Sequence, residues 1–360
     1  MEQKIRIKDI ARLAGVSAGT VDRVLHNRGN VSPAARQAVE AVFEQVDYRP
    51  NIHLSGISLR RRYKIVAAIP EFSQGEYWEC IRRGIGRAVE VYESLRIDCR
   101  FVFYDQFDLY SCREAFGRIA ALSPDGVIIG PTFRDETVGL AARLDELGIP
   151  YVYVDSVIDG TSPLAAFAAD PHTCGYLTGK LIDSITPPDA EFVLFQAVRV
   201  GRASANTTIL RKQGLMDYLT EHGLANNLHR VPFSVMHPER NDELIGDFFE
   251  RHPCVKGAVV LSSRSSVIAA YMDKHRIEGV KLVGVDLTEN NCREIRRGYI
   301  DFVLGQRPEQ QGYLAVKAMI HHLLYGDSAK ACNVMPLDIV TRENLDLYSE
   351  FSEVAYSDAK

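Results

Sequence analysis

Residues 7–32 read IKDIARLAGVSAGTVDRVLHNRGNVS, and this stretch decides the fold at the amino-terminal end of the chain. Apolar side chains recur at helical spacing on both sides of Gly15, which predicts two short amphipathic helices joined by a turn. Ser17 is expected to cap the second helix, and Ser32 with Pro33 predicts the start of a third. The apolar faces of the first two helices are expected to form a small core (Ile10, Ala11, Leu13, Ala14; Val16, Val21, Val24, Leu25).

Two helices that cross over a small core form a helix-turn-helix, whose second helix presents its first side chains to the major groove of DNA. The charge distribution favours the same interpretation. Residues 1–64 hold 12 Lys or Arg against 6 Asp or Glu, whereas the whole chain has a net charge of −5. A basic end on an acidic body is typical of nucleic-acid binding by that end alone.

Length and composition limit the remaining possibilities. A chain of 360 residues, 46% hydrophobic and 25% charged, is expected to form two or three globular domains. The 7 cysteines are scattered without Cys-x-x-Cys spacing, and the 10 histidines show no metal-ligand spacing, so we expect neither disulfides nor a metal. No signal peptide or membrane span is apparent, which predicts a cytoplasmic protein with no membrane partner.

From residue 64 onward, apolar strand-like runs alternate with helix-like stretches, which predicts an α/β body with parallel sheets and right-handed crossovers. Nine or so strands exceed one comfortable sheet, so two lobes are expected. The predicted strands are 65–69, 97–104, 126–129, 151–154, 165–168, 192–195, 257–261, 281–285 and 302–304. The predicted helices are 79–92, 110–121, 135–147, 173–185, 204–222, 239–251, 265–275 and 308–324.

An enzyme is not expected. The sequence has no Gly-x-Gly-x-x-Gly after the first strand, no Walker lysine, no Gly-x-Ser-x-Gly and no His-Glu-x-x-His. These patterns mark the common nucleotide, hydrolase and metalloprotease sites. Neither a catalytic residue nor a cofactor is therefore predicted.

The spaced pattern Asp9-Ile10-Ala11 through Val31-Ser32, followed by Tyr48-Arg49-Pro50-Asn51, resembles the lac repressor (LacI/GalR) family of bacterial regulators. The body resembles periplasmic sugar-binding proteins, which share that family's two-lobed fold. The resemblance implies a helix-turn-helix head at 1–50, a hinge segment at 51–63, a type I periplasmic-binding-protein-like domain at 64–348 and a polar tail at 349–360. Lobe 1 is expected at about 64–160 and 304–328, and lobe 2 at about 161–300 and 329–348.

The resemblance also implies which residues contact operator DNA. The positions that match the family's base-reading residues are Ala18, Gly19 and Arg23, and only Arg23 carries a side chain able to form a bidentate pair with guanine. Position 22 is Asp where many relatives carry Ser, and this acid either pairs with a neighbour or tunes the helix angle. The remaining expected DNA contacts are Ser17 and Thr20 on phosphates, Asn27, and the hinge residues Leu54 and Ile57.

For the ligand, the resemblance implies a cleft between the lobes that binds a sugar or sugar derivative. Ser263 and Arg264 replace the family's usual Asn-Asp pair, and a second arginine there would favour an acidic sugar or a phosphate. The alternative interpretations are a helix cap for Asp170 and a core position for Trp78. The expected ligand residues are Tyr77, Trp78, Asp170, Arg211, Ser263, Arg264, Asp286 and Gln306.

These expectations combine into one functional hypothesis. The chain would be a homodimeric transcription regulator whose affinity for double-stranded operator DNA is controlled allosterically by the ligand. The alternative is a periplasmic-type sugar-binding protein without regulatory DNA binding, which the missing signal peptide and the helix-turn-helix oppose.

Overall fold

The computed structural model describes residues 7–25, 31–45, 62–198, 206–326 and 332–348. Three of the expected DNA contacts, Asn27, Leu54 and Ile57, lie outside these ranges. Within the described ranges, no helix combines the length and the apolar character that crossing a membrane requires.

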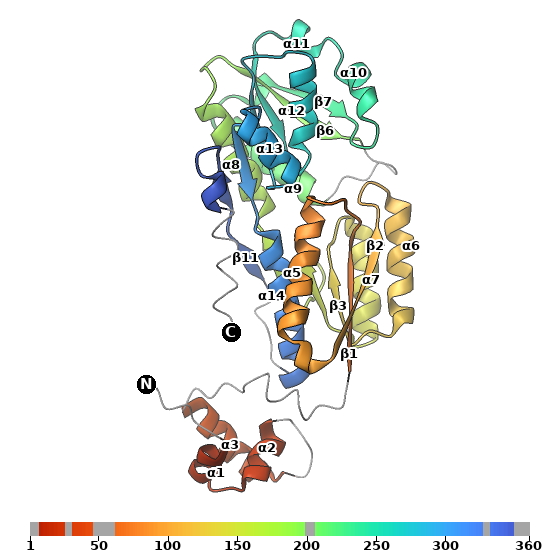
Figure 1. The fold of residues 1–360 in the computed structure, drawn as a ribbon, viewed down its shortest axis with the longest axis vertical. Coiled ribbons are helices and arrows are strands. Elements are labelled where there is room, and N and C mark those ends of the chain that lie inside the picture. The colour runs from red at the N-terminus through yellow and green to blue at the C-terminus, as the bar shows by residue number, and fades with distance from the viewer. Residues whose placement is uncertain (1–6, 26–30, 46–61, 199–205, 327–331, 349–360) are drawn as a thin grey trace.

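The head consists of three helices, α1 (Ile7–Leu13), α2 (Ala18–Leu25) and α3 (Pro33–Gln45), which pack around a small apolar core (Figure 1). Gly15 makes the turn between α1 and α2 with φ of +66°, a conformation that favours glycine. Leu13 was expected in the core but is 56% exposed, because it lies at the last position of the short helix α1. The buried core residues are Ile10, Ala11, Val21, Val24, Val39 and Val42.

Lobe 1 is built on a six-stranded sheet in the order β11-β5-β4-β3-β1-β2, in which every neighbouring pair is parallel. Its strands are β1 (Tyr63–Pro70), β2 (Ile97–Tyr104), β3 (Gly126–Ile129), β4 (Tyr151–Val154), β5 (Ala165–Ala169) and β11 (Asn333–Met335). Helices α5 (Tyr77–Val91) and α14 (Pro308–Tyr325) cover one face, and α6 (Leu109–Ile119) and α7 (Arg134–Glu146) cover the other. Because both faces are covered, the central strands are buried throughout, as parallel sheets require.

Lobe 2 repeats this arrangement with a second six-stranded sheet in the order β12-β10-β9-β8-β6-β7. Its strands are β6 (Glu191–Ala197), β7 (Leu228–Phe233), β8 (Val255–Val260), β9 (Lys281–Val285), β10 (Phe302–Gly305) and β12 (Asp338–Val340). Only the β10–β12 pair is antiparallel. Helices α8 (Pro171–Ser184) and α9 (Asn206–Glu221) cover one face, and α12 (Ser265–Lys274) and α13 (Glu289–Arg297) cover the other. Figure 1 shows the two lobes stacked along the long axis of the molecule.

The chain passes between the lobes three times, after β5, after β10 and between β11 and β12. The first passage lies near residue 170 rather than 160, because β5 pairs with β4 and so belongs to lobe 1. β11 likewise pairs with β5, so the third passage lies after residue 335 rather than at 329. Arg307 and Asp338 tie the second and third passages together, with Arg307 Nε and Nη2 at 2.7 and 2.8 Å from the two carboxylate oxygens.

Some elements differ from the expectation. The predicted helix over 239–251 is broken into α10 (Asn241–Leu244) and α11 (Phe248–Arg251), because Gly246 adopts φ of +50° between them. The periodicity did not predict β7, α13, β11 or β12. Helix α13 carries nine residues of which only Asn291, Glu294 and Ile295 are buried, so its apolar signal is weak. The strands β11 and β12 are three residues long, and each is defined by its pairing with a neighbouring strand, β11 with β5 and β12 with β10.

Candidate functional site

The second helix of the head is capped as the sequence predicts. The backbone N–H of Thr20 donates to Ser17 Oγ at 3.1 Å, and the two hydroxyl oxygens lie 2.9 Å apart. The hydroxyl of Ser17 therefore satisfies a free backbone donor at the start of α2.

The face of α2 that looks away from the head core holds the expected base-reading positions. Ala18, Gly19 and Arg23 are exposed, and Asp22 is half-buried. Val21 and Val24 are buried on the opposite face of the same helix. The eight residues of α2 thus form two faces, one that packs against the head core and one that points outward.

A buried hydrogen-bond relay lies where the two lobes meet. Arg211 on α9 donates from Nη1 to the carbonyl oxygen of Leu261 at 3.0 Å and from Nη2 to Gln306 Oε1 at 2.9 Å. Gln306 Nε2 then donates to Asp286 Oδ1 at 2.6 Å. Arg211, Asp286 and Gln306 are only 4%, 5% and 1% exposed. The structure therefore brings three of the expected ligand residues together.

Lobe 1 contributes a matching carboxylate, Asp155, which the sequence analysis missed. Gln311 on α14 links it to the relay: Gln311 Nε2 donates to the carbonyl oxygen of Gln306 at 2.9 Å, and its Oε1 accepts the Asp155 N–H at 2.8 Å. Asp155 follows β4 and Asp286 follows β9, strands that hold the same place in the two sheets. The repeated pair Val154-Asp155 and Val285-Asp286 is the signal that would have found it.

Burial perturbs the ionisable groups of this cluster. Burial raises the pKa of Asp286 to about 7, although the nearby Arg211 charge and the Gln306 hydrogen bond act in the opposite direction. Burial also raises the pKa of Asp155, again against the effect of Arg211. The pKa of Tyr77 is raised by burial and by the two carboxylates. One buried arginine thus faces two carboxyl groups that do not ionise as readily as exposed ones.

Tyr77 and Trp78, at the start of α5, form an aromatic side of the cavity between the lobes. Their rings meet edge to face with centroids 5.3 Å apart, and both are 5% exposed. A Cβ at Gly130 would lie 2.6 Å from Trp78 Cζ3, so that glycine leaves room for the indole. Arg211 Nε is buried and forms no hydrogen bond with a described residue, whereas the buried Tyr77 hydroxyl interacts with the Asp155 carboxyl group. Arg211 Nε therefore remains available to a polar ligand.

The space enclosed by these groups is small, about 40 Å³. Ligand pockets usually measure ~300–1,000 Å³, so we expect a sugar-sized molecule to bind only when the lobes move apart. Carboxylate, hydroxyl, guanidinium and aromatic groups share the lining. The lining residues are Tyr77, Trp78, Gln106, Thr132, Asp155, Thr207, Thr208, Arg211, Ser262, Ser263 and Asp286. Of these, Gln106, Thr132, Asp155, Thr207, Thr208 and Ser262 were not expected from the sequence.

Two expected ligand residues have other roles in this structure. Asp170 is exposed and caps α8, accepting the Thr173 N–H at 2.6 Å, which is the alternative that the sequence left open. Arg264 does not line the cavity. Its Nη1 forms an ion pair with Glu76 of lobe 1, and its guanidinium carbon lies 5.8 Å from the centre of the Phe107 ring. Glu76 therefore already balances the charge that was expected to favour an acidic ligand.

Hydrogen bonds from backbone and amide groups also join the lobes. The N–H of Glu289 donates to the carbonyl oxygen of Gly75 at 2.9 Å. On the other side of the cavity, Asn206 Nδ2 donates to Ser156 Oγ at 3.0 Å, and its backbone N–H donates to the Thr132 carbonyl oxygen at 3.1 Å. The structure therefore shows the lobes in a closed arrangement.

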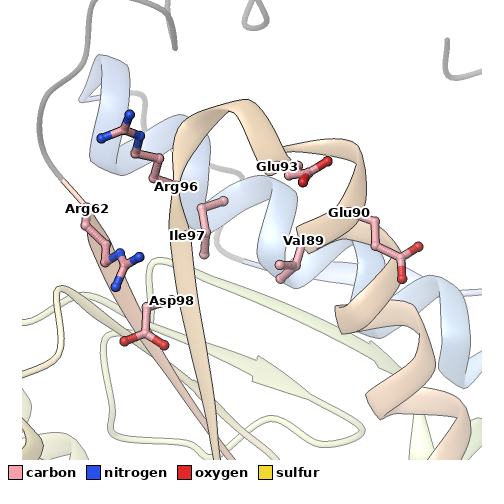
Figure 2. A pocket seen from close by; sticks show the side chains of 7 residues that line it. All are labelled: Arg62, Val89, Glu90, Glu93, Arg96, Ile97 and Asp98. Atoms are coloured by element: carbon pink, nitrogen blue, oxygen red, sulfur yellow. The ribbon is translucent and has the colours of Figure 1, made fainter.

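A much larger hollow, about 730 Å³, lies on the surface of lobe 1 where the chain enters β1 (Figure 2). Its charged side chains have both signs, and they come from the stretch between the end of α5 and the start of β2 and from Arg62 before β1. It lacks the converging buried polar groups that orient a small ligand. The smaller interlobe cavity is thus the better candidate site. The hollow is lined by Arg62, Val89, Glu90, Glu93, Arg96, Ile97 and Asp98.

Comparisons with known proteins agree with this architecture. The family model described as bacterial regulatory proteins of the lacI family matches residues 6–51, and the model described as a periplasmic binding protein domain matches residues 66–327. The chain is 34% identical to the HTH-type transcriptional regulator CelR of Thermobifida fusca over 155 residues, which are 42% of this chain and 45% of that protein. The chain spans less than half the length of the first curated relatives that it matches.

Solved structures give a longer match. A Bacteroides fragilis protein assigned to the LacI transcriptional regulators is 32% identical, with a TM-score of 0.76 over 80% of this chain and 100% of that one. GanP, a glucose-galactose binding protein of Geobacillus stearothermophilus, has the same fold, with 20% identity and a TM-score of 0.68 over 79% of this chain and 99% of that one. The chain belongs to the LacI family of bacterial regulatory proteins, with a helix-turn-helix head joined to a periplasmic-binding-protein domain.

Proposed function

We propose that this protein is a cytoplasmic transcription regulator that binds operator DNA through its head and responds to a small sugar or sugar derivative bound between its lobes. The observation that carries the DNA-binding part is the head itself. Its core is closed by buried valines, while Ala18, Gly19 and Arg23 face outward from α2. This is the geometry with which a helix-turn-helix enters the major groove.

Arg23→Ala tests the DNA-binding part. Loss of the bidentate pair with a guanine should cost roughly 1–3 kcal/mol of operator affinity and lower the ratio of specific to nonspecific binding. The measurement is a fluorescence-anisotropy titration of operator and random duplexes at several salt concentrations, after operator selection from a random library. Arg61→Ala, a sequence-based comparison outside the described residues, should weaken both duplexes equally and reduce the salt slope. An unchanged ratio in Arg23→Ala would refute the assignment.

The ligand part rests on the Arg211–Gln306–Asp286 relay beside Tyr77 and Trp78. Sugar hydroxyls donate and accept hydrogen bonds, and an aromatic ring covers the apolar face of a pyranose. Arg211 faces two carboxyl groups, and Glu76 forms an ion pair with Arg264, so Arg264 is not free to bind an anionic group. These features favour a neutral polyol over an acidic sugar or a phosphate.

A thermal-shift screen of neutral and acidic monosaccharides identifies the ligand, and Asp286→Ala then tests the site. This variant should lose the ligand response while it still binds DNA. The matched control is Asp170→Ala, which removes an exposed helix-capping carboxylate and should leave the ligand response intact. If Asp286→Ala responds with wild-type sensitivity, the interlobe cavity is not the effector site.

The proposed switch follows from the contacts between the lobes. A ligand held by groups of both lobes favours the closed arrangement over the open one. Lobe 1 begins at Tyr63, directly after the hinge segment. A shift of lobe 1 on closure therefore moves the end of the hinge segment that connects it to the head. Because the coupling is reciprocal, operator DNA must change the ligand affinity by the same factor by which ligand changes the DNA affinity.

A further inference from the structure

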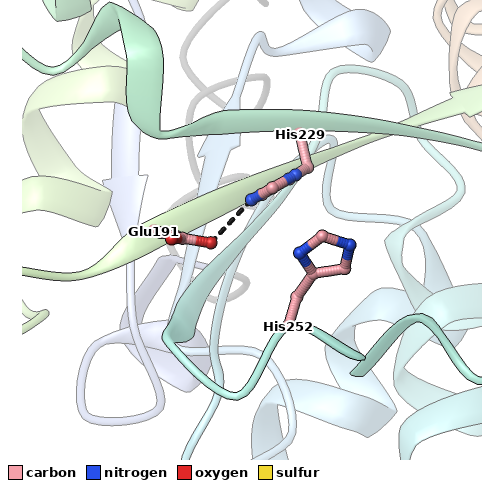
Figure 3. A group of neighbouring side chains, drawn as sticks. All are labelled: Glu191, His229 and His252. Atoms are coloured by element: carbon pink, nitrogen blue, oxygen red, sulfur yellow. Dashed lines mark hydrogen bonds and ion pairs between the residues drawn. The ribbon is translucent and has the colours of Figure 1, made fainter. Parts of the chain in front are cut away.

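A second cluster of chemically active side chains lies in lobe 2, away from the cavity. Glu191 is the first residue of β6, His229 is the second residue of β7, and His252 directly precedes the turn into β8 (Figure 3). The strands are parallel, so these starting positions gather at the opposite edge of the sheet from Leu261 and Asp286, which follow strand ends. The cluster is thus spatially separate from the proposed effector site.

The three side chains converge on one point. His229 Nε2 lies 2.6 Å from Glu191 Oε2, and one ligand atom from each residue lies within 4.8 Å of the other two. The rings of His229 and His252 have centroids 4.3 Å apart, and Phe248 packs against both. His252 forms no side-chain hydrogen bond with a described residue. A hydrogen-bonded His229–Glu191 pair is complete without it, so the pair alone does not explain why a second imidazole nitrogen lies here.

We propose that Glu191, His229 and His252 bind a divalent transition-metal ion, for which Zn²⁺ is the best match. Two imidazole nitrogens and a carboxylate suit Zn²⁺, whereas Ca²⁺ and Mg²⁺ require more oxygen ligands. Ligands of a tetrahedral Zn²⁺ lie about 2.0–2.2 Å from the ion, and therefore about 3.3 Å from one another. The hydrogen-bonded pair opens slightly and His252 moves inward to reach this geometry. Both members of the pair are about one-third exposed, with side-chain values of 29% and 35%, so water completes the coordination.

The ion would act as a structural clamp. β7 is the edge strand of the lobe 2 sheet and is held from one side only, by β6. A metal bound to these three ligands ties the edge strand, its neighbour and the connection from α11 to β8 into one unit. Because the ion binds only the folded site, the thermal stability of the protein rises with the logarithm of the free Zn²⁺ concentration once this exceeds the dissociation constant.

The experiment is a calorimetric titration of the full-length, chelator-treated protein with ZnCl₂, with Co²⁺ absorption spectra to report the coordination number. The wild-type protein should bind one Zn²⁺ at this site and show a rise in melting temperature. His252→Ala and Glu191→Gln should each lower the affinity by at least 10–100-fold and abolish the rise, since even residues that only support a metal ligand have effects of this size.

Two controls separate this site from adventitious binding. His237→Ala removes another histidine of lobe 2, which is exposed and paired with Glu239, and should bind as the wild type does. Cys254→Ser removes the exposed thiol nearest in sequence and should also leave the affinity unchanged. The proposal is overturned if the wild type shows no saturable binding below about 100 µM Zn²⁺, or if His252→Ala and Glu191→Gln, folded by circular dichroism, bind as tightly as the wild type. DNA and sugar binding do not enter this readout, so its failure leaves the proposed function standing.

Discussion

Asp286 and Asp155 hold equivalent places in the two lobes, and the backbone marks them both. Each directly follows a central strand, and each has φ of +71°, which is uncommon for residues other than glycine, asparagine and aspartate. This conformation turns both carboxyl groups into the cavity that they line. Each of these positive φ angles strains the backbone, and the strain occurs at a site where the two carboxyl groups face Arg211.

The raised pKa of Asp286 predicts a dependence of stability on pH. The folded protein holds a proton on Asp286 up to about pH 7, whereas an unfolded chain releases it near its ordinary value of about 3.9. The free energy of unfolding therefore falls as the pH rises through this interval, and Asp155 acts in the same direction. Asn tolerates the same φ as Asp and keeps an oxygen acceptor for Gln306 Nε2. Asp286→Asn should therefore reduce the dependence of the free energy of unfolding on pH, and it should be more stable than the wild type at pH 8.

Urea unfolding of the wild type and Asp286→Asn from pH 4 to pH 8 measures this effect. Asp155→Asn is the companion variant and should also reduce the slope. Identical slopes in the wild type and Asp286→Asn would show that the buried carboxyl group does not carry a raised pKa.

At the level of the elements, two helix pairs pack backbone to backbone through glycines. A Cβ at Gly214 would lie 1.9 Å from the carbonyl oxygen of His172, and one at Gly175 would lie 1.8 Å from that of Arg211. The pair α5 and α14 is built in the same way through Gly84 and Gly312. In lobe 2 the close approach sets the position of α9, which carries Arg211 into the relay.

Gly214→Ala should therefore force α8 and α9 apart. Overpacking of this kind costs roughly 1–3 kcal/mol of stability, and it should also weaken ligand binding because Arg211 moves with α9. Gly117→Ala is the control: Gly117 is exposed on α6, and a Cβ there meets nothing within 4 Å. That variant should gain roughly 0.5–1 kcal/mol. Thermal and urea unfolding measure both, and a neutral Gly214→Ala would contradict the close approach.

The ion pair between Glu76 and Arg264 joins segments of different lobes, at side-chain exposures of 18% and 17%. Glu76→Gln leaves the arginine without its charge partner, and Arg264 Nε already has no partner among the described residues. We expect the closing equilibrium to shift toward the open form by roughly 1–3 kcal/mol, between the values for exposed and fully buried pairs. Small-angle scattering of the ligand-free protein should report a larger radius of gyration.

Glu136→Gln is the matched control for this shift. Glu136 is 10% exposed and pairs with Arg113 at 2.9 Å, but both residues belong to lobe 1. Its loss should leave the radius of gyration at the wild-type value. If both variants behave alike, the Glu76–Arg264 pair does not hold the lobes together.

At the scale of the whole molecule, the basic excess of the amino-terminal end lies mainly outside the helices of the head. Residues 60–64 alone contribute four of its positive charges. In residues 7–25 and 31–45, positive and negative side chains are equal in number, namely Lys8, Arg12, Arg23 and Arg36 against Asp9, Asp22, Glu40 and Glu44. We therefore expect the segments that flank the head to supply the salt-dependent attraction to phosphate, and α2 to supply specificity.

One head reads only a short half-site, so we expect a homodimer that reads a pseudo-palindromic operator. Sedimentation velocity at micromolar concentration should give a dimer. Operator variants should bind tightly only when the half-site centres keep their spacing along the DNA helix. A monomer that binds the operator with full affinity would contradict this prediction.

Several features of the fold were predictable from particular residues. Ser17 and Ser32 do cap α2 and α3, with the Ala35 N–H donating to Ser32 Oγ at 3.3 Å. The predicted strands over 97–104, 126–129, 151–154 and 281–285 match β2, β3, β4 and β9 residue for residue. These signals are local: a cap is read within four residues, and the buried strands β3 and β4 appear as continuous apolar runs. The LacI-family resemblance pointed to Arg211, Asp286 and Gln306, which the structure brings together, and their role in ligand binding stays a prediction.

Other features depend on tertiary contacts that no local pattern contains. The strands β11 and β12 are defined by their pairing with β5 and β10, and the β11–β5 pairing places the third lobe passage later than expected. Asp170 and Arg264 were expected at the ligand, but one caps a helix and the other pairs with Glu76 across the lobes. The Glu191–His229–His252 cluster joins three segments that are distant in the sequence.

The sequence by itself therefore determined the helix-turn-helix, the alternating α/β body and the family, because hydrophobic periodicity and caps act between neighbouring residues. Tertiary structure alone decided which polar groups meet, how strongly burial shifts the pKa of Asp286, and that Arg264 is neutralised. The physical reason is that charge pairing and desolvation depend on distance in space, which the folded chain sets by bringing the ends of separate strands to one cleft.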